Sequence, residues 1–131
     1  MDASILSNRT RWAGRAVSTL PVLFLSFDSV IKLAHFQPVT AAFARLGLPD
    51  RLAEGIGALE LVLLALYLVP RTAPLGAVLL TGFLGGAVVL HVRVGDPLAS
   101  HTFFPIYVGA LFWAGLYLRD VRARALVAPV R

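Results

Sequence analysis

Cysteine is absent from the 131-residue sequence, and charged residues make up only 15% of it. Without a thiol, the chain has no disulfide, no thiolate metal site and no dithiol redox chemistry of its own. Any electrons that it handles must therefore reside on a bound molecule. The scarcity of charge accompanies a hydrophobic content of 58%, which is too high for an ordinary soluble fold. The composition indicates a protein that lies in a lipid bilayer.

The formal net charge of +5 does not indicate a nucleic-acid-binding protein. The arginines lie mainly at the ends of apolar runs, where this residue anchors and orients membrane helices. No helix face is basic enough to follow a phosphate backbone. We therefore expect the lipid bilayer, and no nucleic acid, as a partner.

Four apolar runs are each close to the ~20 residues needed to cross about 30 Å of hydrocarbon. They cover approximately residues 12–36, 51–69, 73–92 and 103–118. Proline and glycine separate them, as in VPRTAP and RVGDPLAS, which are typical of tight turns. The longest connection, FQPVTAAFARLGLPD, could form a short interfacial turn around its ARL segment. The sequence thus predicts an all-α, four-helix transmembrane bundle with short loops, formed by residues 1–131 as a single domain.

The arginine distribution predicts how this bundle is oriented. With four crossings, the N-terminus, the turn at 70–72 and the C-terminus share one side of the membrane. That side holds Arg9, Arg11, Arg15, Arg71, Arg119, Arg122, Arg124 and Arg131, and the other side holds Arg45, Arg51 and Arg93. This bias predicts that both termini are cytoplasmic, because short cytoplasmic loops are enriched in basic residues.

Three ionisable residues, Asp28, Lys32 and His35, fall in the outer half of the first run. At 100° per residue they lie within about 60° of one another on a helix. A single charge at the centre of a membrane helix costs about 2.5–3.5 kcal/mol, so Asp28 and Lys32, spaced i and i+4, are expected to pair. The pair could simply neutralise itself, but ionisable residues inside membranes generally mark functional sites.

Glu60 is the second buried acid that the sequence predicts. Gly57 lies one turn before it on the same helix face, where a neighbouring helix can approach closely. If that neighbour is the first helix, Glu60 reaches Lys32 and forms an Asp–Lys–Glu cluster; a neutral Glu60 bonded to another helix is the alternative. Glu54 falls in the first helical turn, where an acid interacts favourably with the helix dipole.

The third run ends in GFLGGAVVLHVRVGDP, in which Gly82 and Gly86 have the spacing of a close helix contact. His91 is expected to face inward at the end of this contact, with Arg93 paired to Asp96 across the following turn. The chain has three histidines, His35, His91 and His101, and no two of them have a spacing typical of metal ligands. We therefore expect neither a metal site nor a haem.

Several segments together resemble the DoxX-like family of small bacterial membrane proteins. They are FLSFDSVIKL, GIGALELVLLALYLVPRTAPLGAVLL, GFLGGAVVLHVRVGD and HTFFPIYVGALFWAGLYLRD, within residues 12–120. The resemblance implies a four-helix bundle in the bacterial inner membrane. It also implies a link to quinone-dependent redox chemistry, because the family takes its name from a subunit of a thiosulfate:quinone oxidoreductase. Some relatives are associated with thiol redox systems, a role that a chain without cysteine does not match.

Two classes of function remain open. In the first, the chain is a membrane enzyme or redox subunit whose outer pocket binds a quinone or another small lipophilic molecule. In the second, it is a non-catalytic binding, transport or assembly subunit, acting as a homo-oligomer or beside a redox partner. For the first class, the predicted proton-transferring residues are Asp28, Lys32, Glu60 and His91. The predicted ligand-binding residues are His35, Glu54, Arg93 and His101.

Overall fold

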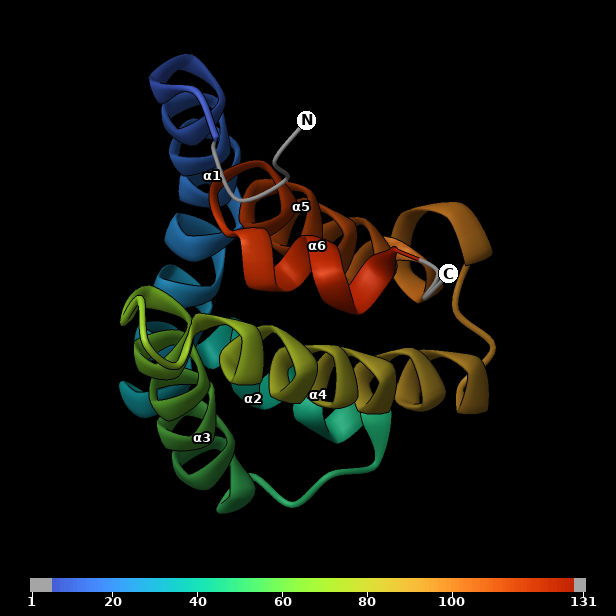
Figure 1. Cartoon of the computed structure of the whole chain (residues 1–131). Coiled ribbons are helices and arrows are strands. Elements are labelled where there is room, and N and C mark those ends of the chain that lie inside the picture. The colour runs from blue at the N-terminus through green and yellow to red at the C-terminus, as the bar shows by residue number, and fades with distance from the viewer. Residues whose placement is uncertain (1–5, 129–131) are drawn as a thin grey trace.

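The computed structural model describes residues 6–128, and the regular elements within them are helices (Figure 1). In chain order they are α1 (Asn8–Leu33), α2 (Gln37–Leu46), α3 (Leu52–Leu68), α4 (Ala73–Arg93), the π-helical segment η1 (Leu98–Thr102), α5 (Phe104–Arg119) and α6 (Val121–Val127). The all-α prediction is confirmed. This part of the chain forms six α-helices, however, where four were predicted.

The four predicted apolar runs correspond to α1, α3, α4 and α5, and the largest difference is at α1. This helix begins earlier than predicted because the Ser7 hydroxyl accepts a hydrogen bond from the Thr10 amide at 3.2 Å and so caps the first turn. It ends earlier because His35 adopts φ 52°, a left-handed conformation that a helix cannot continue. His35 therefore does not share a helix face with Asp28 and Lys32.

Two helices, α2 and α6, were not predicted. A ten-residue helix, α2, replaces the short turn expected at ARL. Pro38 lies in its first turn and Gly47, with φ 74°, ends it in the left-handed conformation that glycine favours. Val39 and Phe43 of α2 pack with Ala53 at the start of α3. At the other end of the molecule, α6 begins after Asp120 and lies against α5 (Figure 1).

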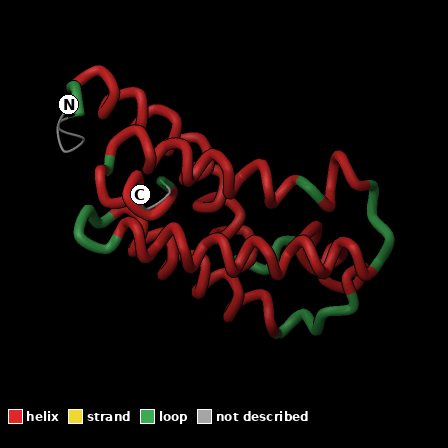
Figure 2. The backbone as a smooth tube through the Cα atoms, turned by 45° about the vertical axis from the view of Figure 1, so that its right-hand side comes forward, coloured by secondary structure: helices red, strands yellow, loops and turns green. Residues whose placement is uncertain are grey.

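The four long helices contact one another in a ring. Helix α1 packs against α3 and α5, and α4 packs against the same two helices. Most of the loops lie at the two ends of the molecule (Figure 2). The side chains of Leu25, Leu64, Leu80 and Phe112 are almost completely buried where these helices meet. Each of the four helices thus contributes to one apolar core.

Three segments are long and apolar enough to cross a membrane, namely Asn8–Leu33, Ala73–Arg93 and Leu98–Arg119. Helix α3 has 17 residues, which gives a length of about 25 Å against a hydrocarbon thickness of about 30 Å. Large apolar side chains such as Leu20, Phe27 and Val62 are more than half exposed on the outside of the ring. Lipid rather than water suits such a surface, and the chain is a small membrane protein with three candidate spans.

Candidate functional site

The ionisable residues of α1 and α3 form one cluster. Lys32 Nζ donates a hydrogen bond to Asp28 Oδ2 at 2.5 Å within α1 and another to Glu60 Oε2 on α3 at 2.9 Å. The side chain of Glu60 is fully buried, whereas that of Asp28 is 29% exposed. The predicted Asp–Lys pair is thus present, and the interhelical contact with Glu60 is present as well.

Gly57 explains how α1 and α3 come close enough for this contact. A Cβ atom at Gly57 would lie 3.0 Å from the backbone oxygen of Ser29 and 3.1 Å from the Cβ of Lys32. Only a residue without a side chain permits this approach without a shift of one helix. The glycine one turn before Glu60 therefore determines the distance between Glu60 and Lys32.

One carboxylate oxygen of Glu60 accepts no hydrogen bond within this cluster. Oε2 accepts the hydrogen bond from Lys32, while Oε1 is buried and has no hydrogen-bond partner among residues 6–128. Leaving a buried polar group unsatisfied costs about 1–3 kcal/mol, and more for a charged group. Glu60 Oε1 is thus an acceptor available to a donor that enters the site.

A cavity of about 480 Å³ lies beside this cluster, between α1, α2, α3, α4 and α5. Its lining includes the four residues predicted to transfer protons, Asp28, Lys32, Glu60 and His91. The rest of the lining is mostly apolar and includes the aromatic rings of Phe24, Phe83 and Phe104. Lys32 Nζ lies 5.9 Å from the centroid of the Phe83 ring, within the range of a cation–π interaction. The cavity combines apolar walls with two separate polar positions.

The second polar position is formed by His91 on α4. His91 Nδ1 donates to Asp96 Oδ2 at 2.5 Å, and Arg45 on α2 donates to the other oxygen of Asp96. Hydrogen bonds from His91 and Arg45 hold the pKa of Asp96 below its ordinary value. The predicted Arg93–Asp96 pair is therefore wrong, because Asp96 turns back toward the end of α4 and meets α2. Arg45 also lines the cavity, so this contact holds α2 over it.

The four residues predicted to bind ligand lie outside the cavity lining. His35 Nε2 donates to Glu54 Oε1 at 2.7 Å on the surface, and this hydrogen bond raises the pKa of His35. The guanidinium group of Arg93 lies over Gly47. The ring of His101 lies 6.1 Å from that of His91, and its Nδ1 is 2.8 Å from the hydroxyl of Ser100. The structure thus pairs His35 with Glu54. It places His101 beside His91.

The surroundings of the glycines in the second half of α4 differ from those that the sequence predicts. Nothing within residues 6–128 would lie within 4 Å of a Cβ atom at Gly82, Gly85 or Gly86. The predicted close contact at Gly82 and Gly86 is therefore not made inside this part of the chain. Gly86 instead contributes to the cavity wall.

Sequence reasoning missed Arg45 and Asp96 as parts of the site. Asp96 was expected only to pair with Arg93 across the turn, and Arg45 was recognised only as one of the arginines that set the orientation. A signal for Asp96 exists, because it is the one acid in the turn directly after His91. No local pattern places Arg45 near it, because the two residues are 51 positions apart and meet only when α2 folds over the cavity.

Comparison with known proteins identifies a family. The model of the DoxX-like family matches residues 16–115, which include α2, α3 and α4 and most of α1 and α5. No curated protein and no solved structure matches the chain. The match covers the cluster of Asp28, Lys32 and Glu60 and also His91.

Proposed function

The chain belongs to the DoxX-like family of small membrane proteins, and we propose that it binds a small lipophilic molecule with a polar head in the cavity beside Glu60. Residues 1–131 act as a single four-helix domain in this proposal. The head of the ligand contacts the cluster of Asp28, Lys32 and Glu60, and its apolar part lies against the aromatic walls. A quinone is the leading ligand class.

One observation carries the proposal: the cavity of about 480 Å³ brings Asp28, Lys32, Glu60 and His91 together within mostly apolar walls. Sites for small molecules typically have volumes of about 300–1,000 Å³, apolar lining and a few converging polar groups. These residues come from three helices, so their convergence is a property of the fold. Simple pairing of Asp28 with Lys32 would require no cavity.

Glu60 Oε1 narrows the chemistry of the ligand head. It is a buried acceptor without a partner among the described residues, so it favours a head with a hydroxyl or another hydrogen-bond donor. A hydroquinone has such hydroxyl groups, and a bound quinone supplies a redox couple whose reduction takes up protons. The carboxylates of Asp28 and Glu60, bridged by Lys32, are in place to hold or release a proton at this head.

His91 supplies a second exchangeable proton at the other polar position. Its Nδ1 donates a hydrogen bond to Asp96, and this bond fixes the ring. Proton exchange with a ligand is therefore assigned to the other ring nitrogen, Nε2. Asp96 and Arg45 thus act as positioning residues. The proposal assigns proton transfer to the cluster and to His91, and assigns the supply of electrons to a redox partner subunit.

The orientation proposed from the arginines places the cavity in the outer half of a bacterial inner-membrane bundle. Four crossings by α1, α3, α4 and α5 would put the α3–α4 turn and both termini in the cytoplasm. Reporter fusions at residues 70–72 and after residue 120 test this topology. A reporter that is active only outside the cytoplasm at either position would contradict it.

The second candidate is a non-catalytic subunit that associates with another helix, in a homo-oligomer or with a partner protein. The open surface of Gly82, Gly85 and Gly86 on α4 favours this function, because small residues let membrane helices approach closely. In this case the cavity would carry no specific ligand.

Extraction of the purified protein distinguishes the two candidates. The protein is solubilised in mild detergent, washed and extracted with organic solvent, and the extract is identified by mass spectrometry. Ligand binding predicts a defined lipophilic compound at close to one molecule per chain, with a quinone absorption spectrum if the leading class is correct. An extract that contains only bulk lipid would favour the assembly function.

A further inference from the structure

A second cavity, of about 460 Å³, lies at the opposite end of α1 from the first. It is formed by the first half of α1, the end of α3 and the end of α5, and three arginines line it, Arg11, Arg15 and Arg119. The ligand site of the proposed function contains none of these residues. The first two arginines are on α1, and the third is the last residue of α5.

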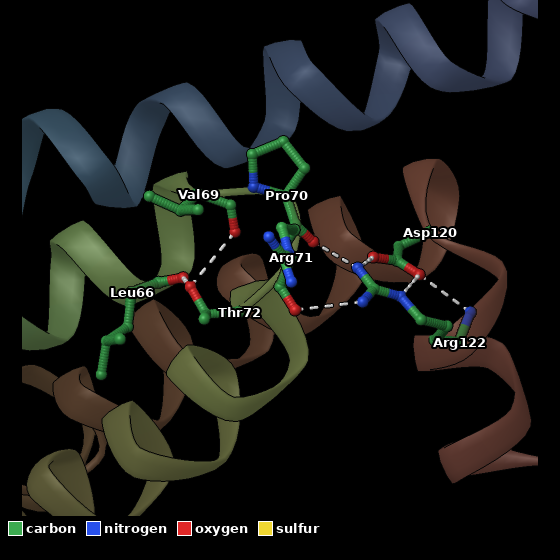
Figure 3. Close-up of polar contacts among 7 residues, drawn as sticks. All are labelled: Leu66, Val69, Pro70, Arg71, Thr72, Asp120 and Arg122. Carbon is green, nitrogen blue, oxygen red and sulfur yellow. Dashed lines mark hydrogen bonds and ion pairs between the residues drawn. The ribbon is translucent and has the colours of Figure 1, made fainter.

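The positive charge of this cavity is not neutralised by its own acidic residue. No ion pair within residues 6–128 involves Arg11, Arg15 or Arg119. Asp120 also lines the cavity, but Arg122 engages both of its oxygens (Figure 3). Arg122 Nε donates to Asp120 Oδ1 at 3.1 Å, and Nη2 donates to Oδ2 at 2.7 Å. Three arginines thus face a cavity whose single carboxylate is already paired.

Arg122 is itself held in place by the turn between α3 and α4. Its guanidinium group donates to the backbone oxygen of Arg71 at 3.1 Å and to that of Pro70 (Figure 3). These contacts keep Arg122 beside Asp120. The carboxylate is therefore engaged by Arg122 and not by the other three arginines.

Arg119 is held in position by two buried residues, Ser18 and Tyr67. Its Nε donates to the hydroxyl of Ser18 at 3.3 Å, and its guanidinium carbon lies 4.9 Å from the centroid of the Tyr67 ring. Tyr67 is completely buried and donates to the backbone oxygen of Phe112 at 2.7 Å. Among the described residues, the two terminal nitrogens of Arg119 have no hydrogen-bond partner. These nitrogens form the fork that guanidinium groups use to bind planar or tetrahedral anions.

The close approach of α1 and α5 brings the arginines of both helices to one place. A Cβ atom at Gly14 would lie 2.6 Å from the backbone oxygen of Gly115 and 2.9 Å from the Cβ of Arg119. Because Gly14 precedes Arg15, this contact places the start of α1 against the end of α5. The cavity therefore lies where α3 and α5 end beside the first half of α1. In a bundle that spans the membrane, helix ends lie at the level of the lipid headgroups.

We propose that this second cavity binds a phosphoryl group between Arg119 and the arginines of α1. Three cations match its negative charge, and the fork of Arg119 matches its oxygens. Val22, Leu23 and Leu68 line the same cavity and provide an apolar wall on which an acyl chain can lie. An anionic phospholipid presents both parts, and free phosphate presents the first. This inference is independent of the proposed function, because it uses a different cavity.

Native mass spectrometry of the detergent-purified protein, titrated with phosphatidylglycerol, tests the proposal. The wild-type protein should hold one phosphatidylglycerol, and a double variant, Arg15→Gln with Arg119→Gln, should bind it on the order of tenfold or more weakly, since hydrogen bonds to charged groups are lost. Arg124→Gln is the matched control. Arg124 lies near the same end but outside the cavity, donating to the backbone oxygen of Tyr117 at 2.7 Å.

Inorganic phosphate distinguishes the source of the phosphoryl group. If free phosphate displaces phosphatidylglycerol, the site recognises the phosphoryl group alone; if it does not, the site recognises a lipid. Either result supports the site. Equal binding by the double variant and the wild type would overturn the proposal, as would an equal loss in Arg124→Gln, which would indicate diffuse attraction by the basic surface. If the double variant does not fold, the single variant Arg15→Gln at an exposed residue gives the same test.

Discussion

Lys32 on α1 donates a hydrogen bond across 2.9 Å to Glu60 on α3, and the two residues are 28 positions apart in the sequence. The same amine donates to Asp28, so one cation lies between two carboxylates. Glu60 is the completely buried member of the three, and Asp28 is partly exposed. The buried carboxylate of Glu60 therefore depends on Lys32 for charge neutralisation more than the partly exposed carboxylate of Asp28 does.

Replacement of Lys32 by Met should destabilise the protein. Removing one partner of a buried ion pair costs about 3–5 kcal/mol when the remaining charge cannot be neutralised. Adding Glu60→Gln to Lys32→Met should recover most of the loss, and adding Asp28→Asn should recover less, because Asp28 reaches solvent. Unfolding in detergent, monitored by circular dichroism, measures both effects. Equal recovery by the two second substitutions would show that burial does not decide which acid needs the cation.

Gly57→Ala should destabilise the contact between α1 and α3. The new methyl group would press on the backbone of Ser29, and overpacking of this kind typically costs about 1–3 kcal/mol. Gly55→Ala is the matched control on the same helix, because nothing lies within 4 Å of a Cβ atom there. That control should be neutral or more stable, since alanine has the higher helix propensity. Thermal melts of both variants check the prediction, and similar melts would contradict the close helix approach.

His35 should titrate at a higher pH than an unfolded histidine, because its hydrogen bond to Glu54 raises its pKa. A raised pKa means that this interaction stabilises the fold fully below a pH of about 6.5 and that the contribution is lost as the pH rises through the folded pKa. NMR titration of the imidazole resonances in wild type and Glu54→Gln provides the measurement. The variant should bring the pKa of His35 down toward the ordinary value. An unchanged titration would mean that the pair does not form in the membrane protein.

The long helices could be predicted from the sequence because each is a long apolar run, and proline or glycine lies in the connections between them. The short helices α2 and α6 could not, because a short amphipathic segment in a connection has no sustained apolar run. The Asp28–Lys32 pair follows from helical spacing alone. Glu60 could be added because Gly57 indicated a close neighbouring helix.

The rest of the site depends on contacts that spacing does not encode. His35 was expected beside Lys32, but the left-handed residue that ends α1 is His35 itself, and no sequence signal marked it. Asp96 was expected to pair with Arg93, its neighbour in sequence, and instead meets Arg45 on α2. That contact requires α2 to be folded over the cavity. Because α2 was not predicted, its contact between Arg45 and Asp96 could not be predicted either.

Ligand occupancy in Glu60→Gln tests the central proposal most directly. The amide keeps the size of the side chain but replaces one acceptor oxygen with a donor, and Glu54→Gln makes the same change at an exposed acid outside the cavity. Both variants and the wild type are purified in parallel, their melts are compared, and the bound molecule is quantified by mass spectrometry. We predict close to one ligand per chain in the wild type and in Glu54→Gln, and occupancy lower by about tenfold in Glu60→Gln, since a hydrogen bond to a charged group is lost. Equal occupancy in all three proteins with equal melts, or a wild-type protein that carries no ligand, would contradict the proposal.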